Sequence, residues 1–361
     1  MRVTYPHMGN MSAPVRHMLE SLAIEVAEAP PISRRTVELG TLHSPEGVCL
    51  PYKLNMGNFL EGLERGADTI VTMCGAGKCR FGFYGAVQQT VLAKGREVAF
   101  CSLDTERLLP DMYCFLRRAA PAAGRLAVAG SIALAVKKLR ALDALSDAKN
   151  YFGPRADAPQ RIIDLCEYGA GEIALADSFA EVNYSRDLIA GVMSSYCRAD
   201  APRPPRVALV GEFYVLLEPY ANHWIENALV RQGVEVKKFV RAGGWAYAKT
   251  LLQTFGLFNE EREYLEQARP YFNHHVGGDG LKSVGTSLWS ARQGYDGIIH
   301  AFPFGCMPEI VAQYALKNIA ADYGLPLLTL SIDEHASDVG IATRLEAFVD
   351  CIKRKKEGSR L

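Results

Sequence analysis

The sequence predicts an α/β protein with two parallel-sheet domains and a helical insert between them. A chain of 361 residues is long for a single hydrophobic core. Short apolar runs alternate with segments of helical spacing in its first hundred residues, and this alternation is typical of βαβ units on a parallel sheet. A proline-rich stretch at 199–206 then precedes a second pattern of the same kind.

The first predicted domain covers residues 1–104. Its expected strands are short apolar runs, and its expected helices have apolar residues at helical spacing. We expect strands at 3–5, 24–26, 69–73 and 98–103, and helices at 15–24, 54–63 and 84–93.

The second and third predicted regions are a helical insert at 105–203 and a C-terminal α/β domain at 204–361. The insert has no convincing strand period, and 122–144 and 162–189 have helical patterns. For the C-terminal domain we expect strands at 207–210, 234–240, 297–300 and 326–332, and a closing helix near 343–353.

Composition limits the classes of partner. Forty basic residues balance forty acidic ones, so the whole chain has no field that favours nucleic acid or a membrane surface. The N-terminus has no signal-peptide pattern, and the longest apolar stretch, 126–136, is too short to span a bilayer. Nine cysteines in such a chain indicate a reducing, cytoplasmic setting and free thiols or metal ligands rather than disulfides.

Four cysteines lie among glycine and proline at the ends of apolar runs: Cys49, Cys74, Cys79 and Cys306. Loops at the carboxyl ends of parallel strands are where α/β proteins place their sites. Cys49 precedes a helix whose N-terminus favours an anionic thiolate. The remaining cysteines are predicted to serve packing: Cys101, Cys114, Cys166, Cys197 and Cys351.

Four thiolates suit either an iron–sulfur cluster or zinc. Cys74 and Cys79 have a spacing that zinc permits, but Cys49 and Cys306 are isolated singles far apart in the chain. The scattered layout favours a cluster in a cleft between the two α/β domains. Whether Cys74 and Cys79 both bind metal, or only one of them, is open at this point.

Charged and polar residues near these segments are further candidates. Lys53, Lys78 and Arg80 place cations beside the presumed thiolates, where they would offset cluster charge or hold an anionic group such as a coenzyme A phosphate, with surface solvation as the alternative. Glu212 closes the first strand of the C-terminal domain and His335 follows its last strand; both are candidate catalytic residues. A hydrogen-bonded structural role is an equal alternative for His335.

Three familiar motifs are excluded. The segment that ends in Lys78 fails the phosphate-loop pattern, because Thr72 stands at the first glycine position and Cys79 at the Ser/Thr position. We therefore predict no nucleotide hydrolysis by this chain. No dinucleotide-binding glycine motif follows a strand, and no serine nucleophile elbow occurs.

Several segments, spread from residue 49 to residue 348, together resemble the 2-hydroxyacyl-CoA dehydratase and benzoyl-CoA reductase superfamily. The resemblance is to its D-component side, and within that to the activase-related branch that includes double-cubane cluster proteins. The segments are Cys49-Leu-Pro-Tyr-Lys53, Gly77-Lys-Cys-Arg-Phe-Gly82 with Tyr84, Gly211-Glu-Phe-Tyr-Val215 with Pro219 and Asn222, Phe304-Gly-Cys-Met-Pro-Glu309, and Asp333-Glu-His335 with Thr343-Arg-Leu-Glu-Ala-Phe348.

The resemblance implies two Rossmann-like domains, a helical region and an oxygen-sensitive 4Fe-4S cluster between the domains. Three cysteines commonly hold such a cluster, which maps onto Cys49, then Cys74 or Cys79, then Cys306. One branch carries a double-cubane 8Fe-9S cluster, for which Cys101 and Cys114 are the nearest additional cysteines.

The chemistry that the resemblance implies is low-potential electron transfer. A separate activase with an actin-like ATPase fold would hydrolyse ATP and inject electrons for the reduction or dehydration of an acyl-CoA or a small unsaturated molecule. Two alternatives stay open: a non-catalytic electron-transfer or scaffold subunit that binds the activase, and a structural zinc protein. We expect a homodimer by default, or a heterodimer, since dehydratases of the superfamily pair two different subunits.

Overall fold

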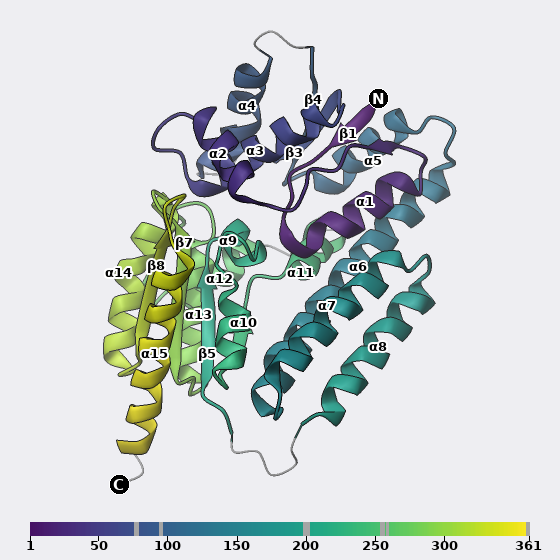
Figure 1. Cartoon of the computed structure of the whole chain (residues 1–361). Coiled ribbons are helices and arrows are strands. Elements are labelled where there is room, and N and C mark those ends of the chain that lie inside the picture. Colours follow the sequence, from purple (N-terminus) through teal and green to yellow (C-terminus); the bar gives the residue numbers. More distant parts are fainter. Residues whose placement is uncertain (76–78, 94–96, 198–202, 253–256, 258–259, 359–361) are drawn as a thin grey trace. The chain divides into compact units, whose positions relative to one another are not determined.

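The computed structural model describes residues 1–75, 79–93, 97–197, 203–252, 257 and 260–358, and the side chains of 260, 261, 263 and 358 are excepted. It is a mixed α/β structure with two four-stranded sheets, and all strand pairs within them are parallel (Figure 1). This confirms the predicted α/β class with two parallel sheets. None of the described helices is both long and apolar enough to cross a bilayer.

The chain forms two compact units. Unit 1 comprises Met1–Arg140, Asp177–Phe179 and Ala242–Asn259, and unit 2 comprises Ala141–Ala176, Ala180–Arg241 and Glu260–Leu361. The helices between residues 105 and 203 are therefore divided between the two units, and one of them, α6 (Arg125–Phe152), contributes to both.

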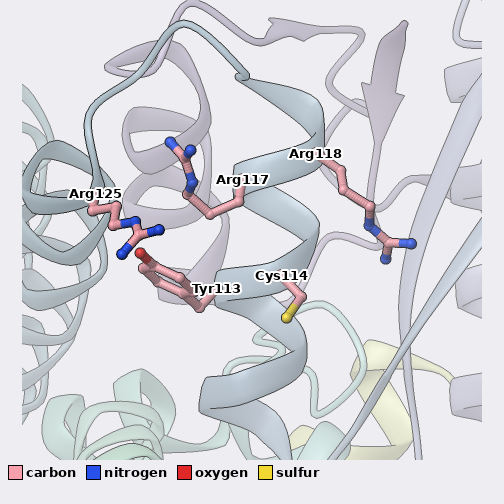
Figure 2. Close-up of a pocket in the computed structure, with 5 residues that line it drawn as sticks. All are labelled: Tyr113, Cys114, Arg117, Arg118 and Arg125. Atoms are coloured by element: carbon pink, nitrogen blue, oxygen red, sulfur yellow. The ribbon is translucent and has the colours of Figure 1, made fainter.

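Unit 1 contains the first sheet, with strand order β2-β1-β3-β4. Its elements are β1 (Arg2–Thr4), η1 (Gly9–Met11), α1 (Ser12–Glu20), β2 (Glu25–Val26), α2 (Arg34–Leu42), α3 (Leu50–Glu64), β3 (Thr69–Cys74), η2 (Arg80–Phe83), α4 (Tyr84–Leu92), β4 (Ala99–Asp104), α5 (Leu108–Ala119), the first part of α6, α11 (Ala242–Tyr247) and the π-helical turn η4 (Ala248–Leu252). Figure 2 shows the turn between α5 and α6.

Successive strand residues of the first sheet point to opposite faces, and each face has its own apolar cluster. On one face Val3 and Leu103 pack with side chains of α1, α5 and α6. On the other face Ile70 and Phe100 pack with side chains of α3 and α4. The sheet is therefore covered by helices on both faces, as the βαβ pattern predicts.

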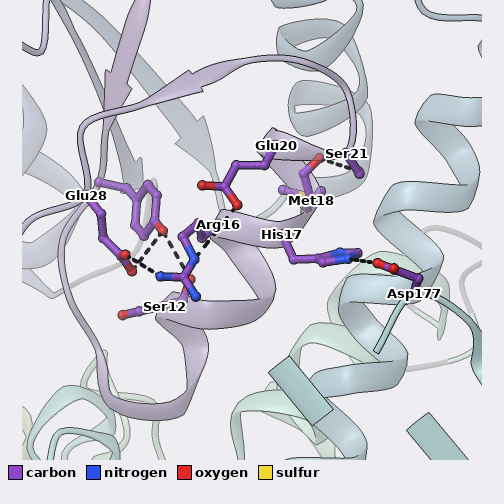
Figure 3. Close-up of polar contacts among 9 residues, drawn as sticks. Ser12, Arg16, His17, Met18, Glu20, Ser21, Glu28 and Asp177 are labelled. Atoms are coloured by element: carbon purple, nitrogen blue, oxygen red, sulfur yellow. Dashed lines mark hydrogen bonds and ion pairs between the residues drawn. The ribbon is translucent and has the colours of Figure 1, made fainter. Parts of the chain in front are cut away.

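A polar network fastens α1 to its neighbours inside unit 1 (Figure 3). Arg16 Nη1 lies 2.9 Å from Glu28 Oε2, and the hydroxyl of Tyr5 donates to the carbonyl of Ser12 at 3.1 Å. His17 Nε2 lies 2.9 Å from Asp177 Oδ1, which joins the helix to a segment distant in the sequence.

Unit 2 contains the second sheet, with strand order β6-β5-β7-β8. Its elements are the second part of α6, η3 (Gly153–Arg155), α7 (Pro159–Leu175), α8 (Phe179–Ser195), β5 (Arg206–Gly211), α9 (Phe213–Leu217), α10 (Ile225–Arg231), β6 (Glu235–Lys238), α12 (Glu260–Ala268), α13 (Gly280–Arg292), β7 (Gly297–Pro303), α14 (Met307–Asp322), β8 (Leu327–Ile332) and α15 (Asp338–Gly358).

The C-terminal part of α6 is fastened to unit 2 by a buried polar network around Glu226 of α10. The Glu226 carboxylate accepts from Asn150 at 2.6 Å and from Lys238 at 2.6 Å. Burial by itself would raise the pKa of Glu226, but the ammonium groups of Lys238 and Lys149 lower it to about 2. The carboxylate therefore stays ionised and paired at neutral pH.

The two sheets are built in the same order. In each, the first strand pairs with the second and third, and the third pairs with the fourth. In each, a helix comes directly before the third strand and another follows it: α3 and α4 around β3, and α13 and α14 around β7. The two units are therefore topologically equivalent.

Packing between α2 and α3 depends on close backbone approach at Gly57. A β-carbon at this position would collide with the carbonyl oxygen of Thr36 on α2. We expect Gly57→Ala to destabilise the protein by about 1–3 kcal/mol, the usual cost of overpacking a core contact, in urea unfolding. Gly130→Ala in α6 is the matched control, since its β-carbon would meet nothing within 4 Å. It should be neutral or stabilise by up to about 1 kcal/mol; equal loss in both variants would contradict the packing argument.

Candidate functional site

The third strand of each sheet delivers a cysteine-bearing segment at its carboxyl end. Cys74 is the last residue of β3, where it pairs with Asp104 of β4, and Cys79 follows as the residue that precedes η2. Cys306 follows β7 and is the N-cap of α14. Because parallel strands end at one edge of their sheet, these positions are where ligand sites of α/β proteins form.

The buried hydroxyl of Tyr84 contacts Cys49 and is within electrostatic range of Cys79. Cys49 is the N-cap of α3, and its sulfur is hydrogen-bonded to the Tyr84 hydroxyl at the start of α4. Burial raises the pKa of Tyr84 most strongly, negative charge on Cys49 raises it further, and charge on Cys79 adds to this. Cys49 and Cys79, thirty residues apart in the chain, thus both act on the Tyr84 side chain, Cys49 by a hydrogen bond and Cys79 by its charge.

Tyr84 is held rigidly in this place. Its side chain is 6% exposed, and its ring packs edge-on against Tyr52 of α3 with centroids 4.9 Å apart. Phe81 makes a second edge-on contact at 6.0 Å. Since edge-to-face contacts fix ring orientation, the hydroxyl is presented to Cys49 without reorganisation.

The backbones of Gly75 and Gly82 approach each other closely between Cys74 and α4. A β-carbon on Gly82 would collide with the carbonyl oxygen of Gly75, so glycine is required there. Arg80 donates from Nη1 to the carbonyl of Gly47 at 3.0 Å and so ties η2 to the loop that carries Cys49. The Arg80 guanidinium also lowers the pKa of Tyr84. Arg80 thus links η2 to the loop that carries Cys49, and its role beside bound thiolates stays a prediction.

The structure describes one of the two lysines predicted to lie beside the thiolates. Lys53 lies one helical turn after Cys49 on α3 and is buried, 9% exposed, rather than solvated. Residues four apart lie on one face of a helix, so Lys53 is on the Cys49 side of α3. Lys78 lies outside the described residues.

Cys74 has different neighbours from Cys49. Burial raises the pKa of the Cys74 thiol, and the carboxylates of Asp104 and Asp111 raise it further. Burial raises the pKa of the Cys101 thiol on β4, and negative charge on Cys74 adds to this shift. A thiol beside two carboxylates is a poorer thiolate than one beside a cation, so the surroundings favour Cys79 over Cys74 as the partner of Cys49.

In unit 2, Cys306 is accompanied by a buried acid–histidine network. His300 of β7 and Glu309 of α14 are both fully buried, with Nε2 and Oε2 2.7 Å apart. Ser283 of α13 donates to Glu309 Oε1 at 3.2 Å. Among the described residues, Nδ1 of His300 has no hydrogen-bond partner. Cys306 itself is 6% exposed.

Our sequence analysis gave no role to His300 or Glu309. The available signal was a histidine inside an otherwise apolar strand, followed after nine residues by a glutamate in the first turn of a helix. Only the fold brings the two side chains together, because the strand and the helix start meet at the edge of the sheet.

Glu212 lies at the same edge of the second sheet. It is the N-cap of α9, where its carboxylate accepts from the backbone N–H groups of Tyr214 at 3.1 Å and Val215 at 2.9 Å. Burial raises the pKa of Glu212 to about 8; the two backbone hydrogen bonds oppose this shift, whereas Asp279 and Glu309 reinforce it. The group is therefore largely protonated at neutral pH, a state suited to proton transfer.

His335 is in a different setting. It follows β8 on an exposed turn, and its backbone N–H donates to Asp333 Oδ1 at 2.9 Å. Among the described residues, no hydrogen bond joins His335 to Glu212. The assignment of His335 as a catalytic residue therefore stays a prediction without a contact that supports it.

The equivalent edges of the two sheets carry different chemistry. The helix before the third strand begins after Cys49 in unit 1 and after Asp279 in unit 2. The helical segment after that strand begins after Cys79 in unit 1 and after Cys306 in unit 2. Unit 1 thus presents two thiols where unit 2 presents one thiol and one carboxylate.

The donor set fits a soft metal. No group of three or more His, Cys, Asp or Glu side chains is already arranged as a metal site within the described part of the chain. The Cys49 thiol nevertheless contacts the Tyr84 hydroxyl and charge on Cys79 acts on it, each cysteine standing at the start of a helical segment. Thiolates are the ligands that iron–sulfur clusters and zinc prefer.

Comparison with known proteins adds no family assignment. The chain matches no known family model, and no curated protein matches it in sequence.

The raised pKa of Glu212 predicts a specific pH dependence of stability. The ordinary value is 4.5 and the folded value about 8, so the folded state retains a proton that the unfolded state loses between these limits. This contribution to stability is therefore fully present below about pH 4.5 and is lost progressively as pH rises towards about 8. We expect Glu212→Gln to remove this part of the pH dependence.

The measurement is the urea midpoint at a series of pH values between 5 and 8.5. This window covers most of the range between the ordinary pKa of 4.5 and the folded pKa of about 8. The matched control is Glu346→Gln, an exposed position on α15. The control should follow the wild-type profile, and Glu212→Gln should give a flatter one. Identical profiles for the wild type and Glu212→Gln would show that Glu212 titrates normally.

Proposed function

We propose that this chain is an iron–sulfur protein of the 2-hydroxyacyl-CoA dehydratase and benzoyl-CoA reductase type. In this proposal it catalyses or relays low-potential electron transfer for reduction or dehydration, with electrons supplied by a separate ATP-dependent activase of actin-like fold. The observation that carries the proposal is the contact of Cys49 with the buried Tyr84 hydroxyl, on which charge at Cys79 also acts, at the carboxyl edge of a parallel sheet.

The proposed ligands are Cys49 and Cys79 of unit 1 with Cys306 of unit 2. Each is the residue immediately before a helical segment, where unpaired backbone N–H groups favour an anionic sulfur. Cys49 and Cys306 share a further feature, a proline at the second helical position, which has no N–H to leave unsatisfied. Cys74 stays a predicted fourth ligand.

When bound, a 4Fe-4S cluster would supply one-electron transfer at low potential, and a double-cubane 8Fe-9S cluster would need additional cysteines. The residues of this chain would tune it. Hydrogen bonds to ligand sulfur and nearby positive charge stabilise the reduced state. The Tyr84 hydroxyl provides such a contact at Cys49, and Arg80 provides the charge beside Cys79.

Unit 2 provides groups that can hold protons. Glu212 carries a proton near neutral pH, and His300 and Glu309 are hydrogen-bonded in a buried pair. Reduction of an organic molecule consumes protons as well as electrons. A buried acid can therefore supply the protons while the cluster supplies the electrons. We propose Glu212 as a proton donor; the acyl-CoA or other unsaturated substrate is not specified by these contacts.

Metal analysis separates the proposal from its alternatives. After anaerobic purification we expect a brown protein with about four irons and matching sulfide per chain, or about eight if the cluster is a double cubane. Absorption spectroscopy with iron, sulfide and zinc analysis is the measurement. A colourless chain with stoichiometric zinc and no iron would contradict the proposal and support a structural zinc protein.

Turnover of an acyl-CoA or a small unsaturated molecule with activase, ATP and reductant would separate an enzyme from a relay or scaffold.

Cysteine substitutions test the ligand set. We expect Cys49→Ser, Cys79→Ser and Cys306→Ser each to lose most of the bound iron, since the serine hydroxyl is a much weaker ligand for iron than thiolate. Cys351→Ser is the matched control at an exposed helical position and should keep full iron content. Circular dichroism of the iron-free variants checks that they are folded.

The pattern of loss assigns each ligand. Full iron content in folded Cys306→Ser would mean that unit 2 provides no cysteine ligand. Full content in Cys79→Ser together with loss in Cys74→Ser would reverse the choice between these two residues.

A further inference from the structure

A second site candidate lies on α5 and α6 of unit 1, on residues that the proposed function does not use. A cavity of about 620 Å³ is lined by Tyr113, Cys114, Arg117, Arg118 and Arg125. This volume is within the range of small-molecule sites. Three of the five lining residues are arginines and none is acidic.

The arginines of the cavity have few partners of their own. Arg117 donates from Nη1 to the carbonyl of Ala123, which anchors the guanidinium and leaves its other N–H groups available. Among the described residues, no carboxylate forms an ion pair with Arg117, Arg118 or Arg125. These guanidinium groups therefore have an unused capacity for anions.

The side chains that line the cavity come from two helices. Figure 2 shows the Arg125 guanidinium and the Tyr113 hydroxyl pointing toward one another, the Arg117 guanidinium turned toward the connection between α5 and α6, and Arg118 on the other flank of α5. Tyr113 and Arg117 are four residues apart and therefore neighbours on one face of α5. Arg125 comes from the start of α6.

The start of α6 adds a further positive contribution. The helix is 28 residues long, and no acidic residue lies in its first turn. The first helical hydrogen bond at this end is donated by Val128 to the carbonyl of Gly124, so the preceding N–H groups have no acceptor within the helix. The positive end of the helix dipole thus lies at Arg125, one of the residues that line the cavity.

We propose that this cavity binds a diphosphate group, free or as part of a small organic molecule. Two guanidinium forks, Arg117 and Arg125, match the paired oxygens of phosphate, and the Tyr113 hydroxyl can donate to a bridging or terminal oxygen. Carboxylate ligands of lower charge would leave part of the arginine charge uncompensated. The Tyr113 ring offers a flat apolar surface for the organic part of such a ligand.

Calorimetric titration of the full chain with sodium pyrophosphate, at about 0.15 M salt, tests the proposal. We expect saturable binding to the wild type and affinity at least about tenfold weaker in Arg125→Gln, because a charge-assisted hydrogen bond is lost. Arg125 is exposed, so this change should leave the fold intact. Arg34→Gln is the matched control: Arg34 is exposed on α2 of the same unit and pairs only with Glu38 there.

Three outcomes overturn the proposal: no saturable binding by the wild type at millimolar pyrophosphate, unchanged affinity in Arg125→Gln, or equal loss in Arg34→Gln. A titration with ADP identifies the source of the diphosphate. Tighter binding of ADP than of pyrophosphate, lost in Tyr113→Ala, supports an organic diphosphate whose ring packs on Tyr113. Equal affinities support the inorganic ion. These titrations do not depend on bound iron, so they succeed or fail separately from the proposed function.

Discussion

Parallel pairing of the strands is the constraint on which the rest of the structure depends. It directs the carboxyl ends of β3 and β7 to one edge of their own sheets, and the helix starts around these strands then meet at that edge. Because of this arrangement Cys49 reaches Tyr84 and Cys79 comes within electrostatic range of it. The same arrangement in unit 2 brings His300 to Glu309. The positions come from backbone topology, and the chemistry comes from the residues that occupy them.

Two topologically equivalent units have thus acquired different side chains at equivalent places. In unit 1 the edge carries thiols and a cation, Arg80, a combination that favours anionic sulfur and therefore a soft metal. In unit 2 the edge is crowded with carboxyl groups, and burial together with mutual repulsion keeps a proton on Glu212. The first environment suits electron transfer and the second suits proton transfer.

The sequence predicts the sheets better than it predicts the contacts of the site. Strand 69–73 is realised as Thr69–Cys74, whereas 297–300 is too short, because the structure extends β7 to Pro303 and buries His300 within it. Glycine and proline residues in the sequence indicated the turns in which Cys49, Cys79 and Cys306 lie. The roles of Tyr84 and Glu309 could not be predicted, since both depend on packing between elements that local patterns leave unpaired.

The balanced net charge of the chain conceals strong local fields. At the start of α6 arginines lie without carboxylate partners among the described residues, whereas burial, reinforced by the carboxyl groups of Asp279 and Glu309, raises the pKa of Glu212 so that it retains its proton. Each added electron makes an organic molecule more basic. In the proposed function, reduction would therefore require a proton donor close to the electron donor. The carboxyl group of Glu212 accepts hydrogen bonds from the backbone N–H groups of Tyr214 and Val215, which fix its position at the start of α9.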